Sequence, residues 1–169
     1  LLDGGKAKGV RVGDKQHLAS IVVSNMDVWH TYHKLLPAQL AKPKKTLAQE
    51  RSLSALIFYW GIKRSFPQLD VHNVFFTEDY KAEFDTLFEH KNVINDPTVY
   101  LNITSKSVPN DAPENAENWF VMINVPGNMG QDWDEIIQRS RQNIIQKLSR
   151  VLGEDIAPLI EVEEILDPR

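Results

Sequence analysis

Two groups of polar residues have the types and spacing that chemistry requires. The first is Asp27, His30 and His33, which recur every third residue in a segment with helical signals. Two histidines one helical turn apart can bind a metal ion, and a carboxylate can serve as a third ligand. A surface helix with partly buried imidazoles explains the same pattern. We favour that interpretation because no further histidine or cysteine cluster completes the shell, and we predict no metal site.

The second group is the run Asp70-Val71-His72-Asn73, in which an acid and a base stand close together. The opening of a strand, with side chains that satisfy a turn, is the alternative that we favour. The chain has no cysteine, no signature of an activated serine, and no Gly-x-Gly-x-x-Gly loop to hold phosphates. Its catalytic residues therefore stay unassigned.

Composition and net charge limit the classes of partner that the chain is expected to bind. With a net charge of −4 and an isoelectric point of about 5.7, the chain lacks the basic surface that nucleic acid binding needs. No apolar run reaches the roughly 18 residues of a membrane span, so we expect a cytoplasmic location. Lys42, Lys44 and Lys45 stand among leucines, and each cation near anionic lipid contributes on the order of 1 kcal/mol. They predict peripheral contact with the inner face of a membrane, and a solvated linker stays open as the alternative.

Hydrophobic periodicity places these groups on an α+β layer in residues 51–169. The pattern there is strand, strand, helix, strand, strand, helix, strand. Asp79 and Asp132 are candidate helix caps, and Gly153 suits a helix end. The pattern predicts a mixed, mostly antiparallel sheet backed by two helices. The expected strands are 53–62, 71–76, 98–104, 119–125 and 159–166.

Residues 1–36 differ from the rest. Residues 7–12 alternate with a period of two, residues 19–24 have the composition of a buried strand, and residues 26–36 suggest a short helix. Residues 37–50 contain prolines and lysines and are typical of a connector.

Helices on one face of the sheet would leave its other face free. If that face were exposed, Phe58, Trp60, Phe120 and Met122 would form an apolar patch of a kind that monomers rarely tolerate. We expect a second domain, a bound apolar ligand or a partner chain to cover it.

Several stretches follow one another along the chain: SIVVSNMD (20–27), SLSALIFYWG (52–61), HNVFF (72–76), DPTVYL (96–101), NWFVM (118–122), QDW (131–133) and DPR (167–169). Together they resemble the bacterial-type phytoene desaturase family, the carotenoid desaturases of the flavin-dependent amine-oxidase-like superfamily. Both glycine-rich flavin-binding segments of that family are missing, so this sequence looks like an internal fragment that is inactive alone.

The resemblance implies the substrate-binding region of an FAD-dependent carotenoid desaturase, an oxidoreductase that removes hydrogens from a linear polyene to extend its conjugation. Residues 1–36 would be trailing strands and a helix of the FAD-binding domain, residues 37–50 a connector, and residues 51–169 the substrate-binding domain. Asn25 is the expected flavin contact. The expected substrate-lining residues are Phe58, Trp60, Tyr100, Asn102, Phe120, Met122 and Asn124. A free-standing apolar-ligand or protein-binding module, and a related carotenoid oxygenase or retinoid saturase, stay open.

Overall fold

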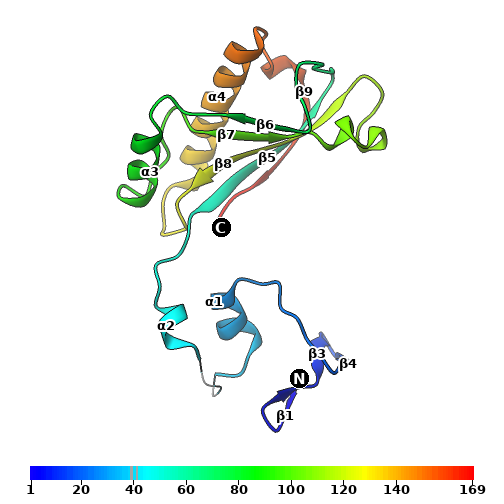
Figure 1. The fold of residues 1–169 in the computed structure, drawn as a ribbon, viewed down its shortest axis with the longest axis vertical. Helices are drawn as coiled ribbons and strands as arrows, with labels where there is room; N and C mark the ends of the chain where they lie inside the picture. Colours follow the sequence, from blue (N-terminus) through cyan, green and yellow to red (C-terminus); the bar gives the residue numbers. More distant parts are fainter. Residues whose placement is uncertain (39, 41) are drawn as a thin grey trace. The chain divides into compact units, whose positions relative to one another are not determined.

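The computed structural model of the chain describes residues 1–169 except 39 and 41. The chain divides into two compact units, residues 1–50 and residues 51–169 (Figure 1). Each unit has its own secondary structure and is described separately below.

The first unit begins with two antiparallel hairpins. Strand β1 (Leu2–Asp3) pairs with β2 (Lys6–Ala7), and β3 (Gly9–Val12) pairs with β4 (Lys15–Leu18). Gly13 has a φ of +56° in the second turn, a backbone conformation that glycine adopts without a steric penalty. The strand indicated by the alternation of residues 7–12 is thus present as β3.

A short helical segment follows these hairpins. Asp27 caps α1 (Val28–His30) by accepting a hydrogen bond from the Trp29 N–H at 2.8 Å. The segment continues as a π-helix, η1 (Thr31–Leu35), and Leu36 is already extended ahead of Pro37. The connector contains one further helical turn, α2 (Lys44–Leu47).

The buried strand predicted for residues 19–24 is wrong. These residues form no strand, and Ile21 and Val23 are 78% and 86% exposed. A strand needs a neighbouring strand to satisfy its backbone N–H and C=O groups. No strand lies beside this segment in the described part of the chain.

The second unit is built on a five-stranded sheet in the order β6-β7-β8-β5-β9. Every neighbouring pair is antiparallel. The predicted fold class, α+β with a mostly antiparallel sheet and helices, is confirmed. The strands are β5 (Ser54–Ile62), β6 (His72–Phe75), β7 (Val99–Asn102), β8 (Glu117–Val125) and β9 (Ile160–Leu166).

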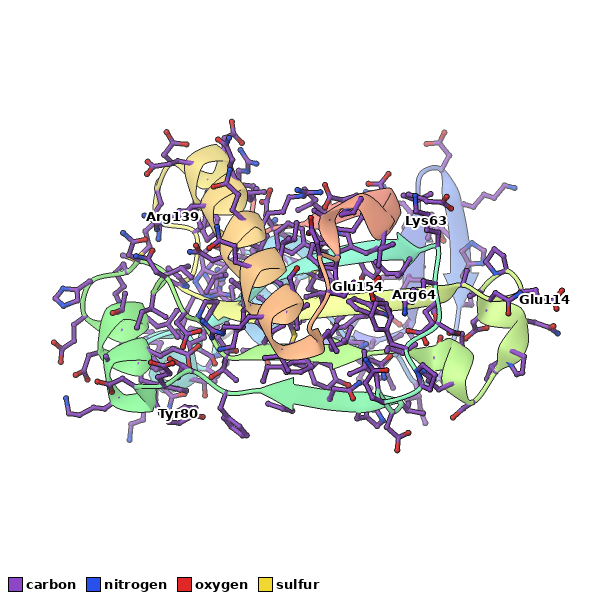
Figure 2. All side chains as sticks on the ribbon, turned by 90° about the horizontal axis from the view of Figure 1, so that it is seen from above. Lys63, Arg64, Tyr80, Glu114, Arg139 and Glu154 are labelled. Atoms are coloured by element: carbon purple, nitrogen blue, oxygen red, sulfur yellow. The ribbon has the colours of Figure 1, made fainter. Side chains whose placement is uncertain are left out.

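Helix α4 (Trp133–Leu152) covers one face of this sheet, toward the viewer in Figure 2. Asp132 caps its first turn by accepting from the Glu135 N–H at 3.1 Å, and Gly153 ends it with a φ of +72°. Both signals were predicted from the sequence. Short 3₁₀ turns complete the unit: η2 (Thr104–Lys106), η3 (Pro109–Asp111) and η4 (Ala157–Leu159).

Helix α3 (Tyr80–Phe88) stands at the ends of the strands (Figure 1). Asp79 caps it by accepting from the Ala82 N–H at 2.9 Å. Glu83 is buried, and its carboxylate accepts from both the N–H and the hydroxyl of Thr98, at 2.8 and 2.7 Å. These bonds attach α3 to the residue that precedes β7.

The hydrophobic core lies between α4 and the covered sheet face. The strands contribute alternate residues, and α4 contributes one apolar side. Its central members include Leu56, Leu101, Val121, Ile144 and Leu148. Lys147 of α4 is also buried, and its Nζ donates to the carbonyl oxygens of Phe76 and Pro97 and to Asp96.

Candidate functional site

The face of the sheet opposite α4 is the candidate functional site. Within residues 51–169, all of which the structure describes, no helix covers β8, β5 and β9 on this side. The register places Phe120 opposite Tyr59 and Met122 opposite Ile57, and all four side chains belong to this face. Tyr59 remains 45% exposed. We call this surface the open face.

Phe58 and Trp60 do not lie on the open face. They are 0% and 2% exposed, and in the register they face Val121 and Trp119 within the core. The prediction that they share a face with Phe120 and Met122 is therefore wrong. Because both alternating sets of β5 are apolar, the cross-strand register decides which set meets α4, and it selects Leu56, Phe58 and Trp60.

The other predicted lining residues share the open face with one another. Tyr100 pairs with Met122 and Asn102 with Phe120 across β7 and β8, and Asn124 pairs with Ala55. Each of Tyr100, Asn102, Phe120, Met122 and Asn124 is half-buried. Sequence reasoning missed Ile57 and Tyr59, although the alternation within β5 was a signal that could have found them.

Four rings form a continuous row across the open face. The ring centroids are 6.1 Å apart for His72 and Tyr100, 6.2 Å for Tyr100 and Phe120, and 5.5 Å for Phe120 and Tyr59. The row crosses β6, β7, β8 and β5 in turn. Rings within about 7 Å stabilise one another and offer a nearly unbroken apolar strip.

A polar cluster stands at the β6 end of this row. His72 Nδ1 lies 2.8 Å from the Tyr100 hydroxyl and 3.2 Å from Asn102 Nδ2. Asn102 Nδ2 also donates to the Val71 carbonyl at 3.0 Å. The open face therefore combines a long row of rings with a set of hydrogen-bonding groups at its β6 end, and it also carries Asn124 and, opposite Tyr59, Glu164.

A second row of rings runs along α3. Phe76, Tyr80, Phe84 and Phe88 follow one another with centroids 6.3, 4.8 and 6.1 Å apart. Phe76 and Tyr80 are 66% and 54% exposed, and Figure 2 shows Tyr80 pointing outward from the unit. Of the apolar residues of α3, only Leu87 is buried.

Charged groups hold the covered side together. Burial alone would raise the pKa of Asp96, but the Glu78 N–H and the Lys147 ammonium both donate to its carboxylate and hold the pKa below its usual value. On the same side Glu117 accepts from the Phe66 N–H and Trp119 Nε1, each at 2.8 Å. Arg64 also pairs with Glu154; both residues are labelled in Figure 2.

The run Asp70-Val71-His72-Asn73 opens a strand, as we favoured. Asp70 accepts from the Val71 N–H at 2.6 Å, and Asn73 Oδ1 accepts from the Asp70 N–H at 3.0 Å. Asn73 Nδ2 in turn donates to the Asp70 carbonyl at 2.7 Å. The side chains of Asp70 and Asn73 satisfy the turn, while His72 belongs to the open face.

The residues considered for a metal take part in separate interactions. Asp27 caps α1, and His33 contacts the Trp29 carbonyl oxygen at 2.7 Å while its ring stacks on Trp29. His30 Nδ1 is buried without a hydrogen-bond partner. Among the residues that the structure describes, no group of three or more histidines and carboxylates is placed to share a metal ion.

Asn25, the predicted flavin contact, lies exposed in the extended segment before α1. Residues 19–27 contain no glycine and lead into a helix of three residues. They therefore do not form the glycine-rich turn and helix start that hold a dinucleotide pyrophosphate. The described residues do not fit the phosphates of FAD, and Asn25 stays a predicted contact only.

The lysines predicted to meet a membrane lie in the first unit. Lys44 and Lys45 begin α2 and are exposed, while Lys42 is half-buried. No helix in the described part of the chain is long and apolar enough to span a bilayer.

Comparison with known proteins places the chain among its relatives. It is 54% identical over 164 residues to the 1-hydroxycarotenoid 3,4-desaturase of Flavobacterium sp. (strain P99-3), covering 97% of this chain. It is 34% identical to the phytoene desaturase of Fusarium fujikuroi over 97% of this chain. The chain is a homologue of the carotenoid desaturases.

The resemblance inferred from the short stretches is thus confirmed along nearly the whole sequence. This carotenoid desaturase homologue spans about a third of the length of its relatives, 33% and 32% for the two above. It is also 32% identical over 97% of its length to the 4,4'-diapolycopene oxygenase of Methylomonas sp. No protein family model matches the chain.

Proposed function

We propose that residues 51–169 form the substrate-binding unit of an FAD-dependent carotenoid desaturase, and that the open face holds a linear polyene. The observation that carries this proposal is the ring row from His72 to Tyr59, which crosses four neighbouring strands on the face opposite α4. The printed names of the relatives supply the class of ligand.

A polyene offers almost nothing to hydrogen-bond, so its affinity must come from apolar area, at roughly 25 cal/mol per Å² removed from water. The open face supplies that area from both aromatic and aliphatic side chains. Besides the rings, its exposed apolar members include Val74, Val162 and Leu166, which are 49%, 65% and 54% exposed. A bound polyene would also explain how a surface of this kind is covered.

In this proposal, residues 51–169 bind the polyene, orient it and exclude water from it. A bound flavin would supply the oxidation by taking one hydrogen of the polyene as a hydride, and the second hydrogen would leave as a proton. No base is assigned for that proton in residues 51–169, because the Asp70 carboxylate satisfies a turn. Asn25 and residues 1–36 are proposed to belong to the flavin-binding part.

Binding to the chain of residues 1–169 tests the proposal. A linear carotene in detergent micelles quenches tryptophan fluorescence, and Trp60 and Trp119 stand on the two central strands. Tyr59→Ser and Phe120→Ser each remove a ring from the row. Half of a ring side chain's area of about 200 Å² is worth about 2.5 kcal/mol, so we expect affinity to fall at least about tenfold.

Val151→Ser is the matched control. Val151 is also an exposed apolar residue, at 54%, but it belongs to α4 on the covered side. We expect this variant to bind as the wild type does. Equal losses in all three variants, or no binding by the wild type, would overturn the proposal.

Peripheral membrane contact is proposed for Lys42, Lys44 and Lys45. Charge reversal at Lys44 and Lys45 should reduce co-sedimentation with anionic liposomes, because both are exposed and each contributes on the order of 1 kcal/mol near such a surface. Unchanged sedimentation would assign these lysines to a solvated linker.

A carotenoid oxygenase is the second candidate, and the similarity to the 4,4'-diapolycopene oxygenase of Methylomonas sp favours it. The open face would hold the polyene in the same way. The full-length protein would then add oxygen to the polyene rather than remove hydrogens from it. Mass spectrometry of the product distinguishes the two reactions, and binding without any product would indicate a module without catalysis.

A further inference from the structure

The polar cluster on the open face has a defined direction of hydrogen bonding. Asn102 Nδ2 donates to the Val71 carbonyl oxygen at 3.0 Å, which identifies it as the amide nitrogen. An amide nitrogen can only donate, so His72 Nδ1, 3.2 Å away, is an acceptor. The proton of the neutral imidazole therefore lies on Nε2.

The same assignment determines what Tyr100 can do. Its hydroxyl, at 2.8 Å, is nearer to the single lone pair of His72 Nδ1 than Asn102 Nδ2 is, at 3.2 Å, and it donates its proton there. The Tyr100 oxygen then keeps only acceptor capacity, because a phenol carries one proton and two lone pairs. A group that donates a hydrogen bond satisfies this oxygen, and one that only accepts does not.

The Tyr100 oxygen belongs to the polar cluster at the β6 end of the ring row. The Tyr100 ring lies between those of His72 and Phe120, 6.1 and 6.2 Å away, so apolar surface continues from it toward β5. A ligand lying along the row toward Tyr59 would have one end at the cluster. The cluster thus stands where an end group, rather than the middle of a chain, would be read.

We propose that Tyr100, oriented by His72, accepts a hydrogen bond from a hydroxyl group at one end of the polyene. This inference rests on the proposed function, because it assumes a polyene on the open face. His72 acts as a positioning residue, since it holds the phenolic proton away from the ligand. The pair would give the site a preference for hydroxylated polyenes over plain ones.

Two probes test the preference: an acyclic carotene, and the same molecule with a tertiary hydroxyl at one end. Their affinities for residues 1–169 are measured in identical micelles by tryptophan quenching. A neutral hydrogen bond contributes up to roughly tenfold in affinity, so we expect the hydroxylated probe to bind up to about tenfold more tightly. Tyr100→Phe keeps the ring and removes the hydroxyl, so it should abolish the difference between the two probes.

Two further variants test whether the preference depends on where the hydroxyl lies and on the acceptor nitrogen of His72. Tyr59→Phe removes a hydroxyl from the same ring row but away from the cluster, and it should keep the preference. His72→Phe keeps a ring on β6 and removes the acceptor, so the preference should fall without vanishing, because the Tyr100 oxygen remains. Near-ultraviolet circular dichroism checks that each variant is folded.

The outcomes distinguish this inference from the proposed function. If the wild type binds both probes equally, or if Tyr100→Phe keeps the preference, hydroxyl recognition by Tyr100 is overturned while polyene binding stands. An equal loss of preference in Tyr59→Phe would also overturn it. If neither probe binds the wild type, the proposed function itself fails.

Discussion

Replacing Lys147 by methionine should strongly destabilise the second unit. Its Nζ donates to the carbonyl oxygens of Phe76 and Pro97, at 2.8 and 2.9 Å, and to Asp96 Oδ1 at 2.9 Å. The Lys147 side chain is 5% exposed, so water cannot readily replace these bonds. Methionine fills a similar volume but donates nothing.

The size of the effect follows from the groups left behind. Each buried carbonyl without a partner costs about 1–3 kcal/mol, and breaking a buried ion pair costs about 3–5 kcal/mol. Asp96 is 34% exposed and regains some hydration, so these costs do not simply add. We expect the free energy of unfolding to fall by about 3–5 kcal/mol, a large part of a typical domain's 5–15 kcal/mol.

Urea unfolding followed by near-ultraviolet circular dichroism measures this change. Lys81→Met is the matched control, because Lys81 also pairs with an aspartate, Asp85, but its side chain is 84% exposed. The control should leave the unfolding midpoint nearly unchanged. If Lys147→Met shifted the midpoint no more than the control does, the reasoning about buried donors would be refuted.

Three more predictions follow from single positions. Phe58→Ala should cost about 3–5 kcal/mol of stability in thermal unfolding because Phe58 is fully buried, whereas Tyr59→Ser should cost much less. Equal costs would contradict the assignment of Phe58 to the core and Tyr59 to the open face. Because the pKa of Asp96 is depressed, its charged form stabilises the fold above about pH 4, and this contribution is lost as pH falls through the folded pKa. The stability advantage of the wild type over Asp96→Asn should therefore shrink between pH 6 and about pH 3 in urea titrations. A constant difference would refute the linkage. Gly153→Ala should cost about 1 kcal/mol of stability from its φ of +72° alone, since an added Cβ meets nothing within 4 Å. Gly127 is equally unhindered but has no positive φ, so Gly127→Ala should be nearly neutral in the same denaturation assay.

Local signals predicted the elements well where one residue type decides the outcome. Asp79 and Asp132 cap their helices, and Gly153 ends α4, because each of these roles depends on a side chain or a backbone conformation within one turn. Residues 98–104 alternate so regularly that the burial of Val99 and Leu101 followed directly.

Tertiary context decided the features that were not predictable. The choice between Phe58 and Tyr59 as the core residue depends on the pairing of β5 with β8, whose residues lie about sixty positions further along the chain. On α3 the buried positions are Glu83 and Leu87, and Glu83 is buried only because Thr98 satisfies its carboxylate. Neither partner is visible in the local pattern.

The polar cluster was missed for a related reason. His72 and Tyr100 are 28 positions apart in the sequence, and their contact arises only from the β6–β7 pairing. Asp70 was the obvious acid near His72 in the sequence, but it satisfies the turn instead. Candidate site residues on a sheet face can therefore be predicted one strand at a time, whereas their hydrogen-bonded combinations require the register.

The neighbouring positions of β5 and β9 have a mechanical consequence. The first strand of residues 51–169 and the last one run side by side, with Ile57 opposite Leu166. The polypeptide consequently enters and leaves this unit at nearly the same place. Both ends of the unit are thus held by backbone hydrogen bonds of the same sheet, on neighbouring strands.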